Sequence, residues 1–218
     1  MKAPLCGRLY AILDLGYVAP ESAEGTTEAL LRGGADLIQL RGKEQSIAEL
    51  ALLTKKLLRL TRAANRPLII NDHAEIARDL PVDGLHLGQD DLGIAAARAI
   101  IRRDCWIGKS THSLGQVRAA VDEGADYIGF GPLFATPTKA DYPPIGLDEI
   151  RAAHGLVAIP IFCIGGIKIE NLPKVLAAGA SRVVIVSGLL QAGDIAAAAR
   201  AAKDLLEATC ESKTCTQQ

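Results

Sequence analysis

The chain has 218 residues, of which 49% are hydrophobic and 4% aromatic, and its formal net charge is -1. This length fits one α/β barrel domain, which commonly has roughly 200–250 residues. The near-neutral charge and scarce aromatic side chains argue against a nucleic-acid-binding surface, which needs cations and stacking platforms. No apolar run approaches the roughly 18 residues of a membrane span, and the N-terminus lacks the apolar core of a signal peptide. We therefore expect a cytoplasmic protein without nucleic-acid or membrane partners.

Short apolar runs alternate with helical patterns along the whole chain. The runs predict strands at 9–13, 37–40, 68–70, 84–87, 106–108, 127–130, 161–164 and 182–186. Helical patterns lie between them, at 28–32, 47–64, 74–79, 94–102, 114–121, 147–153, 171–177 and 195–207. Repeated strand–helix units with short connections predict a parallel sheet, and eight of them can close into a single (β/α)8 TIM barrel. We expect this barrel at residues 1–208, followed by a polar, disordered C-terminal tail at 209–218.

The predicted strands repeatedly end in polar, charged or glycine-rich clusters. In a parallel barrel the carboxyl ends of all strands meet at one rim, so these clusters are expected to build one site. Asp72 and Asp91 each follow a predicted strand, one unit apart. Two carboxylates completed by water and phosphate oxygens suit Mg²⁺. Each acid alone could instead cap a helix, Asp72 one that starts near Ala74 and Asp91 one that starts at Leu92.

Two further groups at this rim could bind anions. Arg41 and Lys43 point the same way at a strand end, because side chains alternate along a strand, and they could grip a diphosphate. Lys139 adds a cation on a long loop at 131–146. The second group follows strands seven and eight, where barrels often bind phosphate, and consists of Gly165, Gly166, Val186 and Ser187. Two anion-binding zones suggest a transferase that joins a phosphorylated acceptor to a donor losing diphosphate, and no residue looks like an activated nucleophile.

Six motifs, in order along residues 10–208, resemble those of the thiamine phosphate synthase family. They are Gln39-Leu40-Arg41-Gly42-Lys43, Asn71-Asp72, His86-Leu87-Gly88-Gln89-Asp90-Asp91, Ser110-Thr111-His112, Gly129-Phe130-Gly131-Pro132 with Thr136-Pro137-Thr138-Lys139, and the strand endings Ile164-Gly165-Gly166 and Val186-Ser187. Six motifs at consistent intervals are far more specific than any one of them.

The family condenses 4-amino-2-methyl-5-(diphosphooxymethyl)pyrimidine with a thiazole phosphate and, with Mg²⁺, releases diphosphate. In the family's mechanism the diphosphate departs before the thiazole nitrogen attacks. By this resemblance, the residues that bind the pyrimidine diphosphate are Gln39, Arg41, Lys43, Asn71, Ser110 and Lys139. Those that bind the thiazole phosphate are Thr136, Thr138, Gly166, Val186 and Ser187. The resemblance implies Asp72 and Asp91 as metal ligands. The catalytic residues that it implies are Arg41, Lys43, Ser110 and Lys139.

Two positions depart from the family pattern. Gly42 replaces an acidic residue between Arg41 and Lys43, which could loosen that loop. Cys163 stands where the family often has glycine, and we expect it to pack in the core rather than narrow the phosphate end. Neither departure removes a proposed contact.

Two other functions are compatible with such a barrel. A thiazole tautomerase of the same family would share the thiazole phosphate pocket and could use His112 as its acid–base group. A non-catalytic binder of phosphorylated ligands would need only the anion-binding zones. The synthase is favoured because the paired aspartates and the nearby cations suit a diphosphate, which neither alternative has to stabilise. The remaining histidines are expected to be structural or exposed: His73, His86 and His154. The sequence does not define an oligomeric state.

Overall fold

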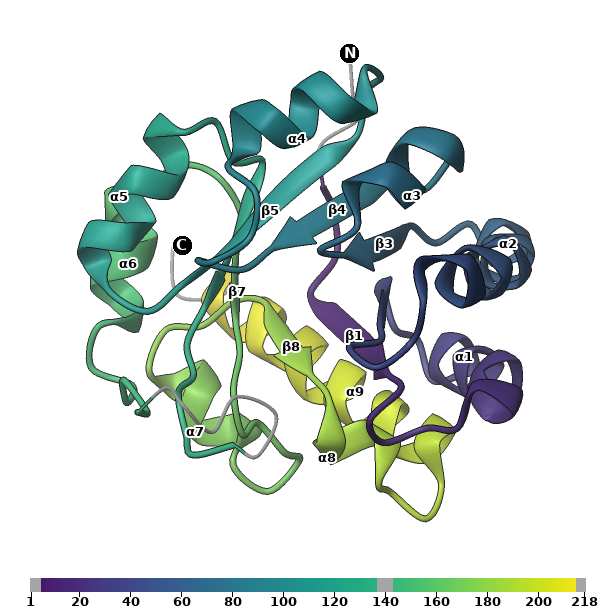
Figure 1. The fold of residues 1–218 in the computed structure, drawn as a ribbon. Coiled ribbons are helices and arrows are strands. Elements are labelled where there is room, and N and C mark those ends of the chain that lie inside the picture. The colour runs from purple at the N-terminus through teal and green to yellow at the C-terminus, as the bar shows by residue number, and fades with distance from the viewer. Residues whose placement is uncertain (1–4, 137–142, 215–218) are drawn as a thin grey trace.

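Eight parallel strands close into a barrel in which each pairs with its neighbour in sequence and β8 pairs back with β1. The structure, a computed structural model, describes residues 5–136 and 143–214. Figure 1 shows helices surrounding the strands. The strands are β1 (Leu9–Asp14), β2 (Leu37–Arg41), β3 (Leu68–Asn71), β4 (Gly84–Leu87), β5 (Trp106–Thr111), β6 (Tyr127–Phe130), β7 (Ile161–Cys163) and β8 (Val183–Ile185). The predicted (β/α)8 TIM barrel is confirmed.

The helices follow the predicted order but differ at several ends. They are η1 (Pro20–Ser22), α1 (Ala23–Arg32), α2 (Ile47–Ala63), α3 (Ala74–Asp79), α4 (Ile94–Ile101), α5 (Leu114–Asp122), α6 (Ile150–Leu156), α7 (Leu172–Ala177), α8 (Ser187–Leu190) and α9 (Ile195–Thr214). Helix α9 continues through residues 209–214, which the sequence places in a tail. No glycine or proline interrupts that stretch, so nothing local stops the helix there. Over the described ranges, no helix combines the length and apolar character that a bilayer span demands.

Strand side chains alternate between the barrel interior and the surrounding helices. The outward-facing ones join a large apolar core beneath the helices. Cys163 belongs to this outer core and is fully buried, and burial raises the pKa of its thiol to about 12. The expectation that Cys163 packs in the core is therefore confirmed, and this side chain leaves the barrel interior free.

The barrel interior is filled below its rim by three aromatic rings. Tyr10 and Phe162 have ring centroids 5.3 Å apart, and Tyr127 lies 5.9 Å from Phe162, both in edge-to-face arrangements. Gly108 makes room for this packing, because a Cβ there would lie 2.1 Å from Cζ of Tyr127. The aromatic rings thus form a floor, and the polar ends of the same strands lie above it.

A buried carboxylate fastens the opposite end of the barrel. Asp36 is 5% exposed, and it accepts hydrogen bonds from the backbone N–H groups of Arg8 (2.8 Å) and Leu9 (3.0 Å) and from Nζ of Lys203 on α9 (2.7 Å). Burial alone would raise the pKa of Asp36, but these hydrogen bonds hold it below its ordinary value. The ionised carboxylate therefore ties the start of β1 to α9.

Replacing this carboxylate should destabilise the fold in a pH-dependent way. We expect Asp36→Asn to lower the free energy of unfolding at pH 7 by about 3 kcal/mol, because Lys203 loses the charged partner of a buried ion pair. The folded-state pKa lies below the unfolded value of about 4, so this stabilisation is complete above pH 4 and fades as the pH falls through the folded pKa. Urea unfolding from pH 7 to pH 3 measures both effects.

The exposed Asp122, at the end of α5, provides the matched control Asp122→Asn. Equal unfolding free energies for the two variants at pH 7 would contradict the stabilising role of Asp36.

Candidate functional site

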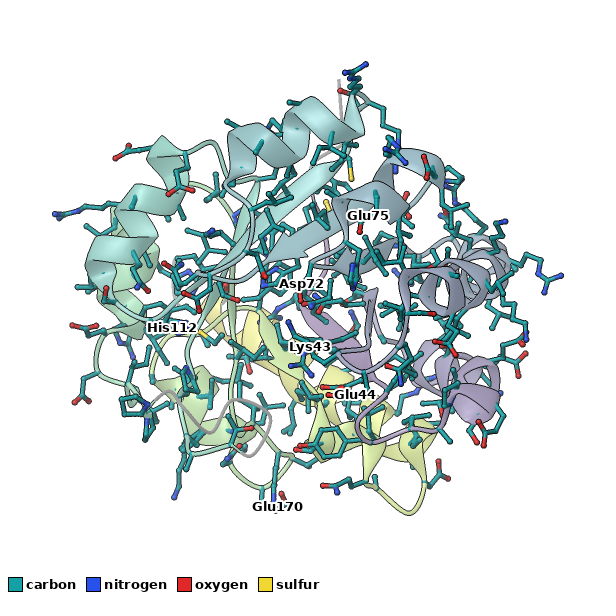
Figure 2. All side chains as sticks on the ribbon, in the orientation of Figure 1. Lys43, Glu44, Asp72, Glu75, His112 and Glu170 are labelled. Carbon is teal, nitrogen blue, oxygen red and sulfur yellow. The ribbon has the colours of Figure 1, made fainter. Side chains whose placement is uncertain are left out.

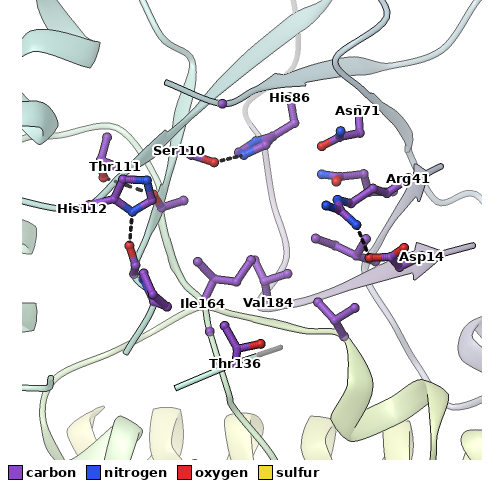
Figure 3. A pocket seen from close by; sticks show the side chains of 18 of the residues that line it. Asp14, Arg41, Asn71, His86, Ser110, Thr111, His112, Thr136, Ile164 and Val184 are labelled. Atoms are coloured by element: carbon purple, nitrogen blue, oxygen red, sulfur yellow. Dashed lines mark hydrogen bonds and ion pairs between the residues drawn. The ribbon is translucent and has the colours of Figure 1, made fainter. Parts of the chain in front are cut away.

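A pocket of about 480 Å³ opens at the carboxyl-terminal rim of the barrel (Figure 3). Each strand contributes lining residues at or next to its carboxyl end, so residues that are distant in sequence share one cavity. The sequence-predicted site residues that line it are Gln39, Arg41, Lys43, Asn71, Asp72, Asp91, Ser110, Thr136, Gly166, Val186 and Ser187. Thr138 and Lys139 lie outside the described residues. The structure thus brings together every predicted site residue that it describes.

The carboxyls of the two predicted metal ligands lie close enough at the rim for each to shift the pKa of the other. Neither caps a helix: His73 is the N-cap of α3 without a side-chain cap bond, and Gly93 is the N-cap of α4. The capping alternative for Asp72 and Asp91 is therefore wrong. Helix α3 begins at Ala74 as expected, but His73 and not Asp72 is the residue that precedes it. Helix α4 begins at Ile94, two residues later than that alternative requires, so Asp91 lies too far from its first turn. Oδ2 of Asp91 instead accepts a hydrogen bond from Gly88 N–H (2.6 Å).

Asp72 occupies a backbone conformation that few side chains adopt. Its φ is 63°, in the left-handed region that aspartate tolerates better than most residues. Its N–H donates to the carbonyl of His86 (2.9 Å), which fixes the turn after β3 against β4. Asp72 Oδ2 forms an ion pair with Nζ of Lys43, and Figure 2 shows these two labelled side chains close together near the barrel mouth.

The paired carboxyls have opposite pKa shifts. Burial and the hydrogen bond with Asp91 raise the pKa of Asp72. Burial acts in the same direction on Asp91, but its hydrogen bonds with Asp72 and Gly88 hold the pKa of Asp91 below its ordinary value. Two adjacent carboxylates resist ionising together, which is why one is pushed toward its protonated form.

This donor set fits a divalent cation. The pair supplies two carboxylates that a dication could hold ionised together, and Mg²⁺ commonly takes one or two protein carboxylates with water and phosphate oxygens. Among the residues that the structure describes, no group of three or more His, Cys, Asp or Glu side chains could cage a metal.

Arg41 is oriented by an acid that the sequence analysis did not select. Its guanidinium forms an ion pair with Asp14, whose side chain is 3% exposed (Figure 3). Asp14 also accepts a hydrogen bond from Gly16 N–H (2.9 Å). The sequence does hold a signal for Asp14, because this polar residue ends β1 and lies on the same strand face as Tyr10, which points into the barrel interior.

The loop between the two predicted cations is closely packed. Gly42 is buried, and a Cβ there would lie 2.5 Å from Oε1 of Gln45 and 2.9 Å from Cδ2 of Leu50. The loosening expected from Gly42 is therefore wrong, because glycine lets the loop pack closely. Helix α2 then starts with a capping box formed by Ser46 and Glu49.

The opposite wall of the pocket is a glycine turn after β7. Gly165 and Gly166 have φ values of 100° and 64°, which glycine adopts without the strain imposed by a Cβ. Asn171 holds this turn, since its Nδ2 donates to the carbonyl of Gly166 (2.9 Å) and its Oδ1 accepts from Lys168 N–H (2.8 Å). Ser187, which opens the unpredicted short helix α8, lines the same wall.

Two histidines line the pocket, and both have defined contacts. Nε2 of His86 lies 3.0 Å from Oγ of Ser110, and its Nδ1 lies 3.2 Å from Oη of Tyr127. Nδ1 of His112 is hydrogen-bonded to the carbonyl of Gly131. His86 thus lines the pocket, whereas its sequence context predicts only a structural or exposed side chain.

Comparisons with known proteins identify relatives of the whole chain. A family model described as thiamine monophosphate synthase matches residues 9–189. The thiamine-phosphate synthase of Chloroflexus aurantiacus is 42% identical over 205 residues, which cover 94% of each chain. That of Halalkalibacterium halodurans is 40% identical over 201 residues, 92% of this chain and 95% of the relative.

A solved structure extends the likeness to three dimensions. The thiamine phosphate pyrophosphorylase of Pyrococcus furiosus has a TM-score of 0.85 and 32% identity, covering 93% of this chain and 96% of its own. The family resemblance of the six motifs is confirmed: the chain belongs to the thiamine monophosphate synthase family and is an enzyme of the thiamine-phosphate synthase type.

Proposed function

We propose that the protein condenses 4-amino-2-methyl-5-(diphosphooxymethyl)pyrimidine with a thiazole phosphate, giving thiamine phosphate and diphosphate. The observation that carries this proposal is the placement of two anion-binding zones across one cavity. The ends of β2, β3 and β4 supply the cations and paired carboxyls, and the ends of β7 and β8 supply the glycine turn and Ser187. These strand groups lie on opposite sides of the closed barrel, which would hold the donor and the acceptor against each other.

The diphosphate zone is assigned to the cations on the β2 loop. Arg41 would grip a diphosphate bidentately, and its ion pair with Asp14 holds one end of the guanidinium in place. Lys43 would exchange its contact with Asp72 for a phosphate oxygen and add a mobile positive charge. Mg²⁺ at Asp72 and Asp91, when bound, would neutralise charge that develops on the departing diphosphate. Lys139 retains its predicted role at the leaving group.

The pyrimidine and thiazole assignments follow the same geometry. Gln39, Asn71 and Ser110 line the inner part of the cavity and are proposed to hold the pyrimidine ring. Residues on the β6 to β8 side are proposed to hold the thiazole phosphate: Thr136, Thr138, Gly166, Val186 and Ser187. In the proposed reaction diphosphate leaves first and the thiazole nitrogen then attacks the pyrimidine cation. The chain would contribute positioning and charge stabilisation, so it needs no nucleophile.

The alternative functions make less use of this pocket. A thiazole tautomerase could use His112, but it would leave the Asp72–Asp91 pair without a task. A non-catalytic binder would likewise gain nothing from two half-buried carboxyls beside its anionic ligand, since like charges repel. The synthase is the proposal that gives each charged group a role.

A diphosphate-release assay separates the three functions. With both phosphorylated substrates present, we expect release that requires Mg²⁺ and stops when EDTA removes it, because the leaving group depends on charge neutralisation. Conversion of the thiazole phosphate alone would support the tautomerase. Binding of either ligand without any turnover would support the binder.

The metal assignment can be tested by removing one carboxylate. Asp91→Ala should lower kcat by at least about 10²-fold, because charge stabilisation of the leaving group is lost. Circular dichroism and the thermal midpoint should stay near those of the unaltered protein. Asp122→Ala removes a carboxylate from the exposed end of α5 and should retain full activity. Near-normal turnover by Asp91→Ala would remove Asp91 from the metal site.

The geometry of Arg41 predicts a substrate-selective defect. Arg41→Lys keeps the charge but loses the two parallel N–H donors, so KM for the pyrimidine diphosphate should rise about tenfold. KM for the thiazole phosphate should change less than twofold, because that ligand is assigned to the opposite wall. Initial rates measured with each substrate varied in turn give both constants. Equal increases in the two KM values would refute the assignment of Arg41 to the diphosphate zone.

A further inference from the structure

A chain of hydrogen bonds crosses the barrel interior and joins two pocket residues. Nε2 of Gln39 donates to Oη of Tyr10 (2.5 Å), and this oxygen lies 3.3 Å from Oη of Tyr127. From Tyr127 the chain continues to Nδ1 of His86 (3.2 Å). Nε2 of His86 then reaches Oγ of Ser110 (3.0 Å), a contact drawn in Figure 3. We call Gln39, Tyr10, Tyr127, His86 and Ser110 the relay.

The strands are adapted to hold the relay in the interior. Tyr10 and Tyr127 are 1% and 0% exposed, so each hydroxyl depends on a protein partner. Gly108 leaves the space that the ring of Tyr127 occupies. Gly129 lies opposite His86, where an added Cβ would be 3.4 Å from its Cε1. The relay therefore rests on packing as well as on its hydrogen bonds.

The amide of Gln39 sets the direction in which the relay donates. Because Nε2 of Gln39 donates to Tyr10, the Tyr10 hydroxyl proton is available for Tyr127. With the Tyr127 proton then directed to Nδ1 of His86, the neutral imidazole would carry its own proton on Nε2 and would donate it to Ser110.

The two ends of the relay consequently present opposite hydrogen-bonding character. Ser110 accepts from His86, so its own hydroxyl proton is available to a ligand in the pocket. Oε1 of Gln39 is a buried acceptor without a partner among the described residues. A ligand matched to these ends needs an N–H donor for Gln39 and a nitrogen or oxygen acceptor for Ser110.

A 4-aminopyrimidine offers both groups, an exocyclic amine and unprotonated ring nitrogens. We propose that the relay selects the 4-aminopyrimidine substrate over its 4-oxo analogue, with Tyr10, Tyr127 and His86 as positioning residues. The 4-oxo ring replaces the amine donor with a carbonyl acceptor, which would face the acceptor Oε1 of Gln39. This inference rests on the proposed function and adds to it the residues that set specificity.

Tyr127→Phe tests the relay with little change in volume. The ring still fills the space beside Gly108, but the link between Tyr10 and His86 is lost. Gln39 and His86 can then each reverse their donor and acceptor atoms independently. We expect the ratio of kcat/KM for the amino substrate to that for the 4-oxo diphosphate to be at least about 10³ in the unaltered protein. In Tyr127→Phe this ratio should fall at least tenfold, with KM for the thiazole phosphate unchanged.

Tyr17→Phe is the matched control, because Tyr17 is half-buried and does not line the pocket. It should keep the full ratio. Equal loss of activity on both pyrimidines in Tyr127→Phe would mean a structural role and would overturn the relay. If the unaltered protein is active and Tyr127→Phe keeps the ratio, the relay falls and the proposed function stands. If the unaltered protein turns over neither pyrimidine, the proposed function itself fails.

A spectroscopic measurement tests the relay without relying on the activity of any variant. The ¹⁵N resonances of His86, identified by their loss in His86→Gln, should show Nδ1 as an unprotonated acceptor and Nε2 as protonated. A protonated Nδ1 would reverse the direction of the relay and overturn the proposal even if Tyr127→Phe fails to fold.

Discussion

Closure of eight parallel strands is the constraint on which the site depends. It sends every strand end to one rim, and the alternation of side chains then decides which residues face the cavity. On β2 this alternation directs Leu37, Gln39 and Arg41 inward, from the apolar floor to the charged rim. A shift of one residue in register would place Arg41 against the helices and remove it from the pocket.

Charge balance explains how such a polar pocket persists above an apolar floor. Asp14 and Asp72 each hold a cation, so the positive groups are paired and oriented before any ligand arrives. The second carboxyl of the acid pair, Asp91, is stabilised by Gly88 N–H and by the positive charges of Lys43 and Lys109. A bound diphosphate and divalent cation would replace these contacts with stronger ones. The diphosphate would contact the cationic side chains, and the metal would contact the two carboxylates. The same groups would be costly to bury without that match.

Sequence reasoning was most successful where periodicity and motif order agree. The strands, the barrel and the convergence of the predicted site residues all follow from short apolar runs with polar ends. It was less successful where the determining contact is distant in sequence. Asp14 matters because Arg41 lies beside it, and His86 matters because Tyr127 and Ser110 flank it. Neither pairing is visible in a local pattern. The sequence predicts an end at residue 207 for helix α9, which continues to Thr214. Its polar last turns lack the apolar periodicity that marks a packed helix.

The proposed reaction requires this one cavity to stabilise a diphosphate anion through its cations and its acid pair. Calorimetric titration of inorganic diphosphate into the protein, with and without Mg²⁺, measures this directly. We predict one binding site per chain that requires Mg²⁺, weakens at least tenfold in Asp91→Ala and is competed by the pyrimidine diphosphate. Binding of equal strength without Mg²⁺ and in Asp91→Ala would contradict the account.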